Sequence, residues 1–305
     1  MKSNIILSLL FVSVDASLRV LFIGDSIDRY ALEDWCEGRG HHCKALNQMG
    51  LYSWKPTSCS TKALGPDTTL NSLFNHTKRI NSWSIAVCDD ITHNITLGFL
   101  FNMQGVSPYR PWFDPAKSCQ GMLGYPPLNK AVTVNDTFTF AQGPAIAPLI
   151  KAMGGPPHAV TLNSIFWDIS RLVTTESGVN EEGVRICETP HLRSEWVKDW
   201  ARNASELVDV TFNLLGNIPW KGWRAANPIS NPIPPCRQDM VLEMNAAARA
   251  IAARKHLHYL DYFNLPNVSV GMRDAHHPNR EVSVAYVKKL LMRIRRSGGR
   301  VDASS

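Results

Sequence analysis

The stretch LRVLFIGDSIDRY, residues 18–30, decides the fold that this sequence predicts. Its first half is an apolar, β-favouring run that predicts a buried strand, and Gly24-Asp25-Ser26 ends that run. Residues 27–38 then show the spacing of a helix. A strand that turns sharply into a helix places Ser26 at the helix N-terminus, where backbone N–H groups and the positive end of the helix dipole converge. Ser26 is therefore either a candidate nucleophile, with its own N–H beside a developing oxyanion, or part of an ordinary capped turn.

The composition is that of an ordinary globular protein. The chain has 305 residues, of which 44% are hydrophobic and 19% charged, and this excludes a disordered or fibrous chain. The formal net charge is +6, and much of the excess lies in residues 288–300, KKLLMRIRRSGGR. A solvated helix end explains this cluster, and attraction to an acidic polysaccharide or an anionic surface is the alternative. Nucleic-acid binding is not expected, because the basic residues form no stripe with interleaved aromatic residues.

The first sixteen residues predict a secretory signal peptide. Lys2 precedes an apolar run over residues 5–14, and Val14 and Ala16 supply the small residues of a cleavage site. An N-terminal strand or a short membrane anchor is the alternative interpretation, and no later segment predicts a transmembrane helix. We therefore expect a protein of the extracellular space or the secretory lumen, with one domain over residues 17–296 and a disordered tail over residues 297–305.

Sequons and cysteines support secretion. Five N-x-S/T sequons predict N-glycosylation at Asn75, Asn94, Asn135, Asn203 and Asn267. The seven cysteines lack C-x-x-C spacing, which argues against a zinc knuckle or a redox motif. In a secreted chain they predict up to three disulfides and one free thiol, with the pairing open. His41-His42-Cys43 has no partner motif, so no metal site is expected.

Predicted strands and helices alternate along the chain. The predicted strands span residues 18–23, 42–46, 84–87, 95–105, 158–166, 218–229 and 258–262. The predicted helices span residues 27–38, 70–81, 145–153, 192–215, 238–255 and 281–296. This alternation predicts a three-layer α/β/α sandwich with a mainly parallel central sheet.

A second chemical motif precedes the last predicted helix. In Arg273-Asp274-Ala275-His276-His277-Pro278, the Asp274 carboxylate lies three positions from His277 and can orient its imidazole. His277 is then a candidate general base for a serine hydroxyl, with His276 as the alternative. A helix-capping aspartate beside surface histidines is the commoner explanation of D-x-x-H alone. In an open α/β sheet, however, loops at the carboxyl ends of the strands gather at one edge, so both motifs can reach one site.

The two motifs together resemble the SGNH (GDSL-type) hydrolase superfamily, whose fold is a flavodoxin-like sandwich. GDSIDRY together with NSIFWDISR, residues 163–171, resembles the PC-esterase branch, which includes the trichome-birefringence-like polysaccharide O-acetylation proteins. The resemblance runs from about residue 18 to residue 296. The usual G-x-N-D pattern is absent, since Leu162 precedes Asn163 and Ser164 follows it, and this departure fits the PC-esterase branch.

The resemblance implies a role for each matching residue. Ser26 would be the nucleophile, His277 the base and Asp274 its orienting partner. The side-chain amide of Asn163 and the Ser26 N–H would form the oxyanion hole, with Gly105 as the third donor. No metal or organic cofactor would be required.

Four further residues have two interpretations each. Trp167, Asp168 and Arg171 either line the site or brace the strand, and bracing is favoured for Trp167. Arg29 either reaches an anionic substrate or forms a surface salt bridge, which is the simpler explanation.

The function that the resemblance implies is that of a secreted serine esterase. It would remove small acyl groups, O-acetyl above all, from an acylated carbohydrate through an acyl-enzyme. A polysaccharide O-acetyltransferase with the same triad, a lipid esterase and a catalytically inactive glycan-binding protein are the alternatives.

Overall fold

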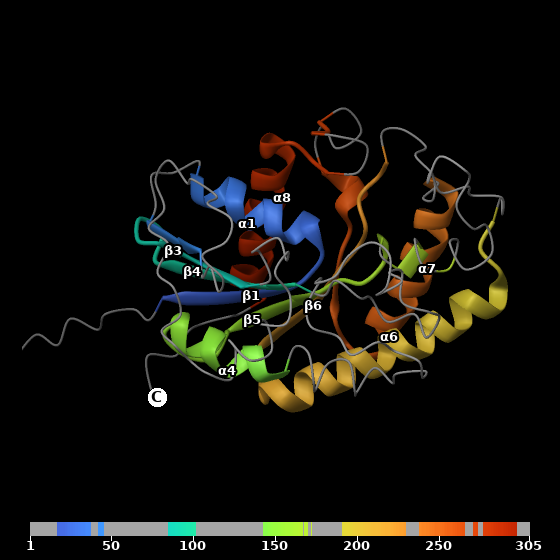
Figure 1. The fold of residues 1–305 in the computed structure, drawn as a ribbon, viewed down its shortest axis with the longest axis horizontal. Helices are drawn as coiled ribbons and strands as arrows, with labels where there is room; N and C mark the ends of the chain where they lie inside the picture. Colours follow the sequence, from blue (N-terminus) through green and yellow to red (C-terminus); the bar gives the residue numbers. More distant parts are fainter. Residues whose placement is uncertain are drawn as a thin grey trace, which may run out of the picture.

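A central sheet organises the computed structural model of this chain, in which residues 17–37, 42–45, 85–101, 143–166, 168–169, 172, 191–229, 238–265, 271–273 and 277–297 are described. Within these residues the sheet has seven strands in the order β2-β3-β4-β1-β5-β6-β7 (Figure 1). The strands are β1 (Leu18–Gly24), β2 (His42–Ala45), β3 (Ile85–Asp90), β4 (Ile95–Phe101), β5 (Ala159–Leu162), β6 (Trp220–Arg224) and β7 (His258–Leu260). Strands β4, β1, β5, β6 and β7 pair in parallel, whereas β3 pairs antiparallel with both β2 and β4. The predicted mainly parallel sheet is confirmed.

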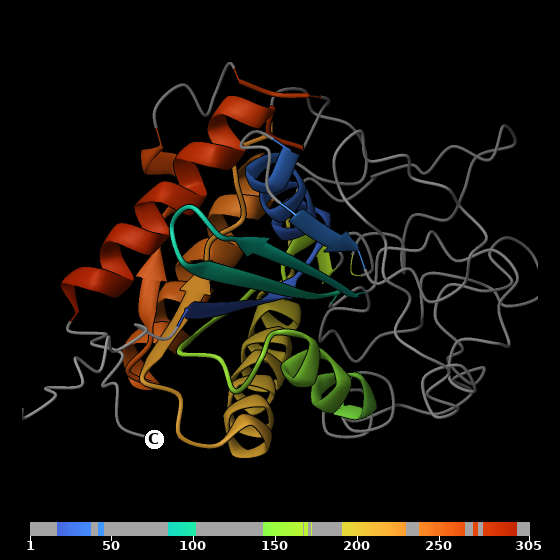
Figure 2. The same ribbon diagram turned by 90° about the vertical axis from the view of Figure 1, so that its left-hand side faces the viewer.

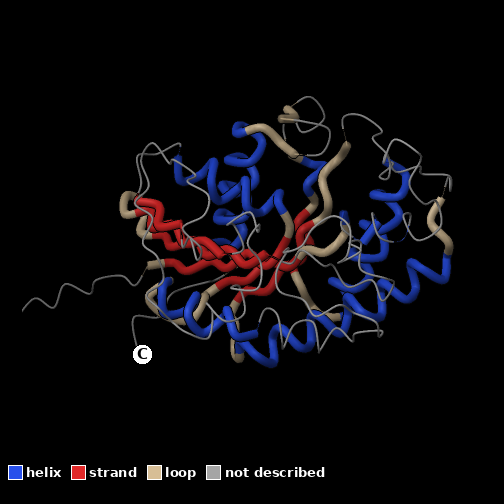
Figure 3. Tube along the Cα trace, in the orientation of Figure 1, coloured by secondary structure: helices blue, strands red, loops and turns tan. Residues whose placement is uncertain are grey.

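Helices cover both faces of the sheet. They are α1 (Ser26–Glu37), α4 (Gly143–Ala152), α6 (Ser194–Leu215), α7 (Gln238–Arg254), α8 (Arg280–Arg296) and the short 3₁₀ helix η2 (Tyr262–Asn264). Helices α1 and α8 pack against each other on one face, and α4 and α6 lie on the other (Figures 1 and 3). Helix α7 contacts α6 and the strands β6 and β7. This arrangement confirms the predicted α/β/α sandwich, and no helix of the described residues is long and apolar enough to cross a membrane.

Strand β1 lies at the centre of the sheet and of the core. Its neighbours are β4 on one side and β5 on the other, and every β1 residue except Arg19 is buried. Parallel strands covered on both faces have continuous apolar runs, which explains the run VLFI over residues 20–23 of β1. The antiparallel β3–β4 pair lies toward one edge of the sheet, where Figure 2 shows it facing the viewer.

Strands β5 and β6 are shorter than predicted. Strand β5 ends at Leu162, because the chain after it turns helical: the Ile169 N–H donates to the Ile165 carbonyl, and both isoleucines are buried. Strand β6 ends at Arg224, because the Asn245 side chain of α7 bonds both the N–H and the carbonyl of Ala226. The Asn245 side chain thereby makes the two hydrogen bonds with the Ala226 backbone that a neighbouring strand would have made if β6 continued.

Other element boundaries shifted by a few residues. Strand β7 ends at Leu260 and gives way to η2, so the strand predicted to residue 262 was also too long. The helix predicted over residues 70–81 lies outside the described residues, as does the part of the predicted β4 strand beyond Phe101.

One disulfide joins the helix that carries Ser26 to the sheet. Cys36 at the end of α1 bonds Cys88 in β3, with Cα atoms 6.3 Å apart and a sequence separation of 52 residues. In the chain-entropy account, closing a loop of this size stabilises the fold by about 4 kcal/mol. The side chains of the other five cysteines lie outside the described part of the structure.

Candidate active site

The turn between β1 and α1 presents Ser26 at the first position of the helix. Asp25 caps the helix, since its Oδ1 accepts a hydrogen bond of 2.9 Å from the Ile27 N–H and its carbonyl accepts one of 3.2 Å from the Arg29 N–H. Ser26 itself is half-buried. A serine in this place lies where the helix dipole favours negative charge, and the four N–H groups of a first turn point toward the same space.

Ser26 contacts His277 directly. The Ser26 Oγ lies 2.7 Å from the His277 Nε2, although 251 residues separate the two in sequence. With Nε2 unprotonated, the serine hydroxyl donates to it, which is the arrangement that a general base requires before it accepts a proton. The structure thus brings together the two ends of the chain that the sequence singled out.

The loop before α8 holds His277 in place through its own main chain. The Arg273 N–H donates to the His277 carbonyl at 2.7 Å, and the Asn279 N–H donates to the Gly271 carbonyl at 2.8 Å. Asn279 then caps α8 by accepting a hydrogen bond of 3.1 Å from the Val282 N–H. These bonds join residues 271–273 to residues 277–279 and thereby fix the backbone of His277 ahead of α8. Asp274, the predicted partner of His277, lies outside the described residues, and so do His276 and Gly105.

Asn163 lies beside the nucleophile turn. It follows β5 directly, and its N–H donates to the Ile23 carbonyl of β1 at 3.0 Å. Its side-chain amide is fully buried and donates to the Arg224 carbonyl at 2.8 Å. An amide nitrogen carries two hydrogens, and this bond uses one of them while fixing the plane of the group. The residue predicted as a side-chain oxyanion donor is thus adjacent to the turn that carries Ser26.

A buried charge cluster supports the same turn, and the sequence did not reveal it. Arg224 donates to Asp25 at 2.7 Å and to both carboxylate oxygens of Asp28 at 2.7 and 2.9 Å, with all three side chains at most 3% exposed. Burial raises the pKa of Asp28 to about 6, although the charge of Arg224 opposes the rise. Burial alone lowers the pKa of Arg224, but the charges of Asp25 and Asp28 outweigh it and raise that pKa above its ordinary value.

Gly24 is required by this cluster. A Cβ atom at Gly24 would collide with the carboxylate of Asp28, so the glycine of the GDS motif makes room for the ion pair beneath the turn. The sequence carried no local signal for this cluster, because β6 also contains the charged Lys221, which is only partly buried.

Two of the remaining predicted residues have structural contacts in place of a described role at the site. Asp168 is buried and accepts a 2.5 Å hydrogen bond from the Ser164 hydroxyl, which favours bracing of the segment after β5. Arg29 pairs with Glu33 at 3.4 Å, so the predicted salt bridge is confirmed. Trp167 and Arg171 lie outside the described side chains. Among the described residues, no group of three or more histidines, cysteines or acidic residues is arranged to hold a metal ion.

Two of the five sequons fall within the described residues. Asn94 is exposed in the turn between β3 and β4, with a φ of 53°, and Asn203 is partly exposed on α6. The other three, Asn75, Asn135 and Asn267, lie outside the described part of the chain.

The sequence matches no protein-family model and no curated protein. Solved structures that resemble the fold include an acetyl xylan esterase from the rumen bacterium Butyrivibrio proteoclasticus, at 13% identity and a TM-score of 0.43 over 94% of this chain and 65% of that one. A native aryl esterase from M. smegmatis aligns at 12% identity and a TM-score of 0.44, over 92% of this chain and 99% of that one. A GDSL-like lipase from Bacteroides thetaiotaomicron aligns at 11% identity and a TM-score of 0.39, over 90% and 88% of the two chains. The roles of individual residues are therefore inferred from the geometry of this site.

Proposed function

We propose that this chain is a secreted serine esterase of the SGNH type, which removes small acyl groups, O-acetyl above all, from a carbohydrate. The observation that carries the proposal is the 2.7 Å contact between the Ser26 Oγ and the His277 Nε2 at the N-terminus of α1. A capped surface serine has no need of an imidazole in this position, whereas a nucleophile does. The resemblance of the two motifs to SGNH hydrolases supports the same assignment.

In the first half of the reaction, Ser26 becomes acylated. His277 Nε2 takes the hydroxyl proton while Oγ forms a bond to the ester carbonyl carbon, and Asp274 is proposed to hold the other imidazole nitrogen. The carbonyl π electrons move onto oxygen, and the Ser26 N–H, the Asn163 amide and Gly105 are proposed to stabilise that oxyanion. The bond to the alkoxy oxygen then breaks, and His277 gives its proton to the departing sugar hydroxyl.

In the second half, water removes the acyl group. His277 takes a proton from water while the water oxygen attacks the carbonyl carbon of the acyl-enzyme. When the second tetrahedral intermediate collapses, the bond between that carbon and the Ser26 Oγ breaks, and His277 returns the proton to Ser26. The products are a carboxylic acid and the free serine. If a sugar hydroxyl replaces water, the same steps transfer the acyl group, and this is the acetyltransferase alternative.

We also propose that the protein matures in the secretory pathway. The predicted signal peptide over residues 1–16 and the five sequons support this, and the Cys36–Cys88 disulfide fits an oxidising compartment. Asn94 and Asn203 are at least partly exposed and suit glycan attachment.

A fluorophosphonate probe tests the proposed chemistry, because it reacts covalently with activated serines. We expect labelling of the wild type, loss of labelling in Ser26→Ala, and full labelling in the matched control Ser194→Ala, whose serine is exposed at the first position of α6. An unlabelled wild type, or labelling that survives in Ser26→Ala, would contradict the proposal. Acetate release from an acetylated xylooligosaccharide, measured with and without a second sugar acceptor, then separates hydrolysis from transfer.

A further inference from the structure

A single stripe along α1 connects the proposed nucleophile to the loop that carries the proposed base. Ser26, Tyr30 and Asp34 follow one another at intervals of four residues, so their side chains lie on one face of the helix. Ser26 contacts His277, and Asp34 contacts Arg273, which lies four residues before His277. Arg273 and His277 therefore contact α1 at positions two turns apart.

We propose that Arg273 is a positioning residue that holds His277 over Ser26. The inference rests on the proposed function, since it has a catalytic meaning only if His277 is the base. Arg273 reaches His277 by two routes, one through side chains and one through the main chain.

The side-chain route begins with the ion pair to α1. One guanidinium nitrogen of Arg273 donates to both carboxylate oxygens of Asp34, at 2.7 and 2.9 Å. The Asp34 side chain is only 6% exposed and that of Arg273 is 35% exposed, so the pair is anchored in the protein on the Asp34 side. A pair held this way has a defined geometry, unlike an ion pair between two fully solvated side chains.

The same guanidinium also packs on the ring that touches His277. Its Cζ lies 4.2 Å from the centroid of the Tyr30 ring. Tyr30 meets the His277 ring edge-on, with centroids 4.9 Å apart and an interplanar angle of 72°. Arg29, tied to Glu33, packs on the same tyrosine at 4.7 Å. Tyr30 thus packs against two cations and makes a T-shaped contact with the imidazole.

The main-chain route is a single short hydrogen bond. The Arg273 N–H donates to the His277 carbonyl at 2.7 Å. Because Asp34 fixes the end of the Arg273 side chain, this bond ties the backbone of the base to α1, which also carries the nucleophile. A misplacement of about 1 Å between reacting groups can cost about a hundredfold in rate, so a link that fixes His277 relative to Ser26 has a large effect on turnover.

Steady-state kinetics with a small neutral ester, p-nitrophenyl acetate, tests this role on the full chain. We expect Arg273→Gln to lower kcat about tenfold with KM within about twofold of the wild type, because the base is displaced while ester binding is retained. Arg273→Lys should recover part of kcat, since it restores a charge for Asp34 but not the planar stack on Tyr30.

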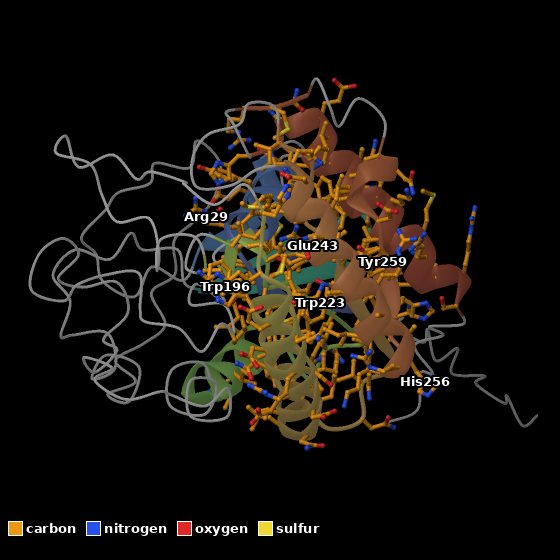
Figure 4. The ribbon with its side chains drawn as sticks, turned by 90° about the vertical axis from the view of Figure 1, so that its right-hand side faces the viewer. Arg29, Trp196, Trp223, Glu243, His256 and Tyr259 are labelled. Atoms are coloured by element: carbon orange, nitrogen blue, oxygen red, sulfur yellow. A yellow bond between two sulfur atoms is a disulfide. The ribbon has the colours of Figure 1, made fainter. Side chains whose placement is uncertain are left out.

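Arg249→Gln is the matched control. Arg249 pairs with Asp261 at 2.9 Å and packs over the Tyr259 ring at 4.8 Å, which repeats the Arg273 arrangement elsewhere in the domain. Figure 4 shows Tyr259 well away from Arg29 of α1. We expect this variant to keep kcat and KM within about twofold of the wild type.

Asp34→Asn keeps the test informative if Arg273→Gln folds poorly. It should lower kcat about as much as Arg273→Gln, and the double variant should lose little more than either single one, because both remove the same contact. A kcat for Arg273→Gln within twofold of the Arg249→Gln value would overturn the inference. So would a loss confined to KM, which would make Arg273 a substrate-binding cation. Activity surviving in Ser26→Ala would instead refute the proposed function.

Discussion

The carbonyl oxygen of Arg224 accepts a 2.8 Å hydrogen bond from the side-chain amide of Asn163, while the guanidinium of the same arginine holds Asp25, the residue before Ser26. One residue of β6 therefore contacts both the nucleophile turn on β1 and the proposed oxyanion donor after β5. In the sheet, β5 lies between β1 and β6 and pairs with both of them. Arg224 thus joins the two halves of the site from beneath.

Replacing Arg224 should strongly destabilise the fold. In Arg224→Met, the carboxylates of Asp25 and Asp28 stay buried without their cation, and breaking a buried ion pair in this way costs about 3 to 5 kcal/mol. Urea denaturation measures this loss. The control is Arg202→Met, which removes an exposed pair with Asp199 and should cost at most about 1 kcal/mol. Equal losses in the two variants would rule out a structural role for the cluster.

Removing the amide of Asn163 should affect turnover more than folding. If Asn163 donates to the oxyanion, Asn163→Ala should lower kcat about a hundredfold to a thousandfold, which corresponds to about 3 to 4 kcal/mol of transition-state stabilisation. Asn245→Ala is the matched control, because Asn245 is also a buried amide that bonds the backbone, at Ala226. We expect that control to lose about 1 to 3 kcal/mol of stability, with kcat per folded molecule retained. Similar kcat values for both variants would remove Asn163 from the oxyanion hole.

Asp28 should make the stability of the wild type depend on pH. Its pKa is raised from 3.8 to about 6 by burial, so the folded protein binds more protons than the unfolded chain between these values. The contribution of this group is fully present below pH 3.8 and is lost as the pH rises through about 6, a change of about 3 kcal/mol. Asp28→Asn lacks the titrating group, so the unfolding free energy of the wild type minus that of the variant should fall between pH 4 and pH 7. A difference that rises over this range would show that the Arg224 charge outweighs burial.

The sequence was sufficient for the parts of the fold that depend on local pattern. The apolar run of β1, the break at Gly24 and the helix after it follow from residue type alone, and the structure confirms them. The contact between Ser26 and His277 was expected, because loops at the carboxyl ends of the strands gather at one edge of an open α/β sheet and both motifs were predicted to lie in such loops. Long periodic helices such as α6 and α8 were also predicted to within a few residues.

The contacts beneath the site could not be predicted, because they depend on strand order. Arg224 and Asp25 are 199 residues apart, and nothing local distinguishes an arginine that turns inward from one that faces solvent. Arg273 and Asp34 are 239 residues apart and meet only because α8 packs beside α1. The end of β6 was missed for a similar reason, since the Asn245 side chain comes from a later helix.

The sequence separation of 251 between Ser26 and His277 has a consequence for the timing of activity. During synthesis the serine, its cap and its helix are made long before the base. Under the proposed function, a growing or prematurely terminated chain holds an inert alcohol, because no imidazole is present to accept its proton. Esterase activity would then appear only after His277 has been made and has packed against Ser26, so a simple ester assay would report that both segments have folded together.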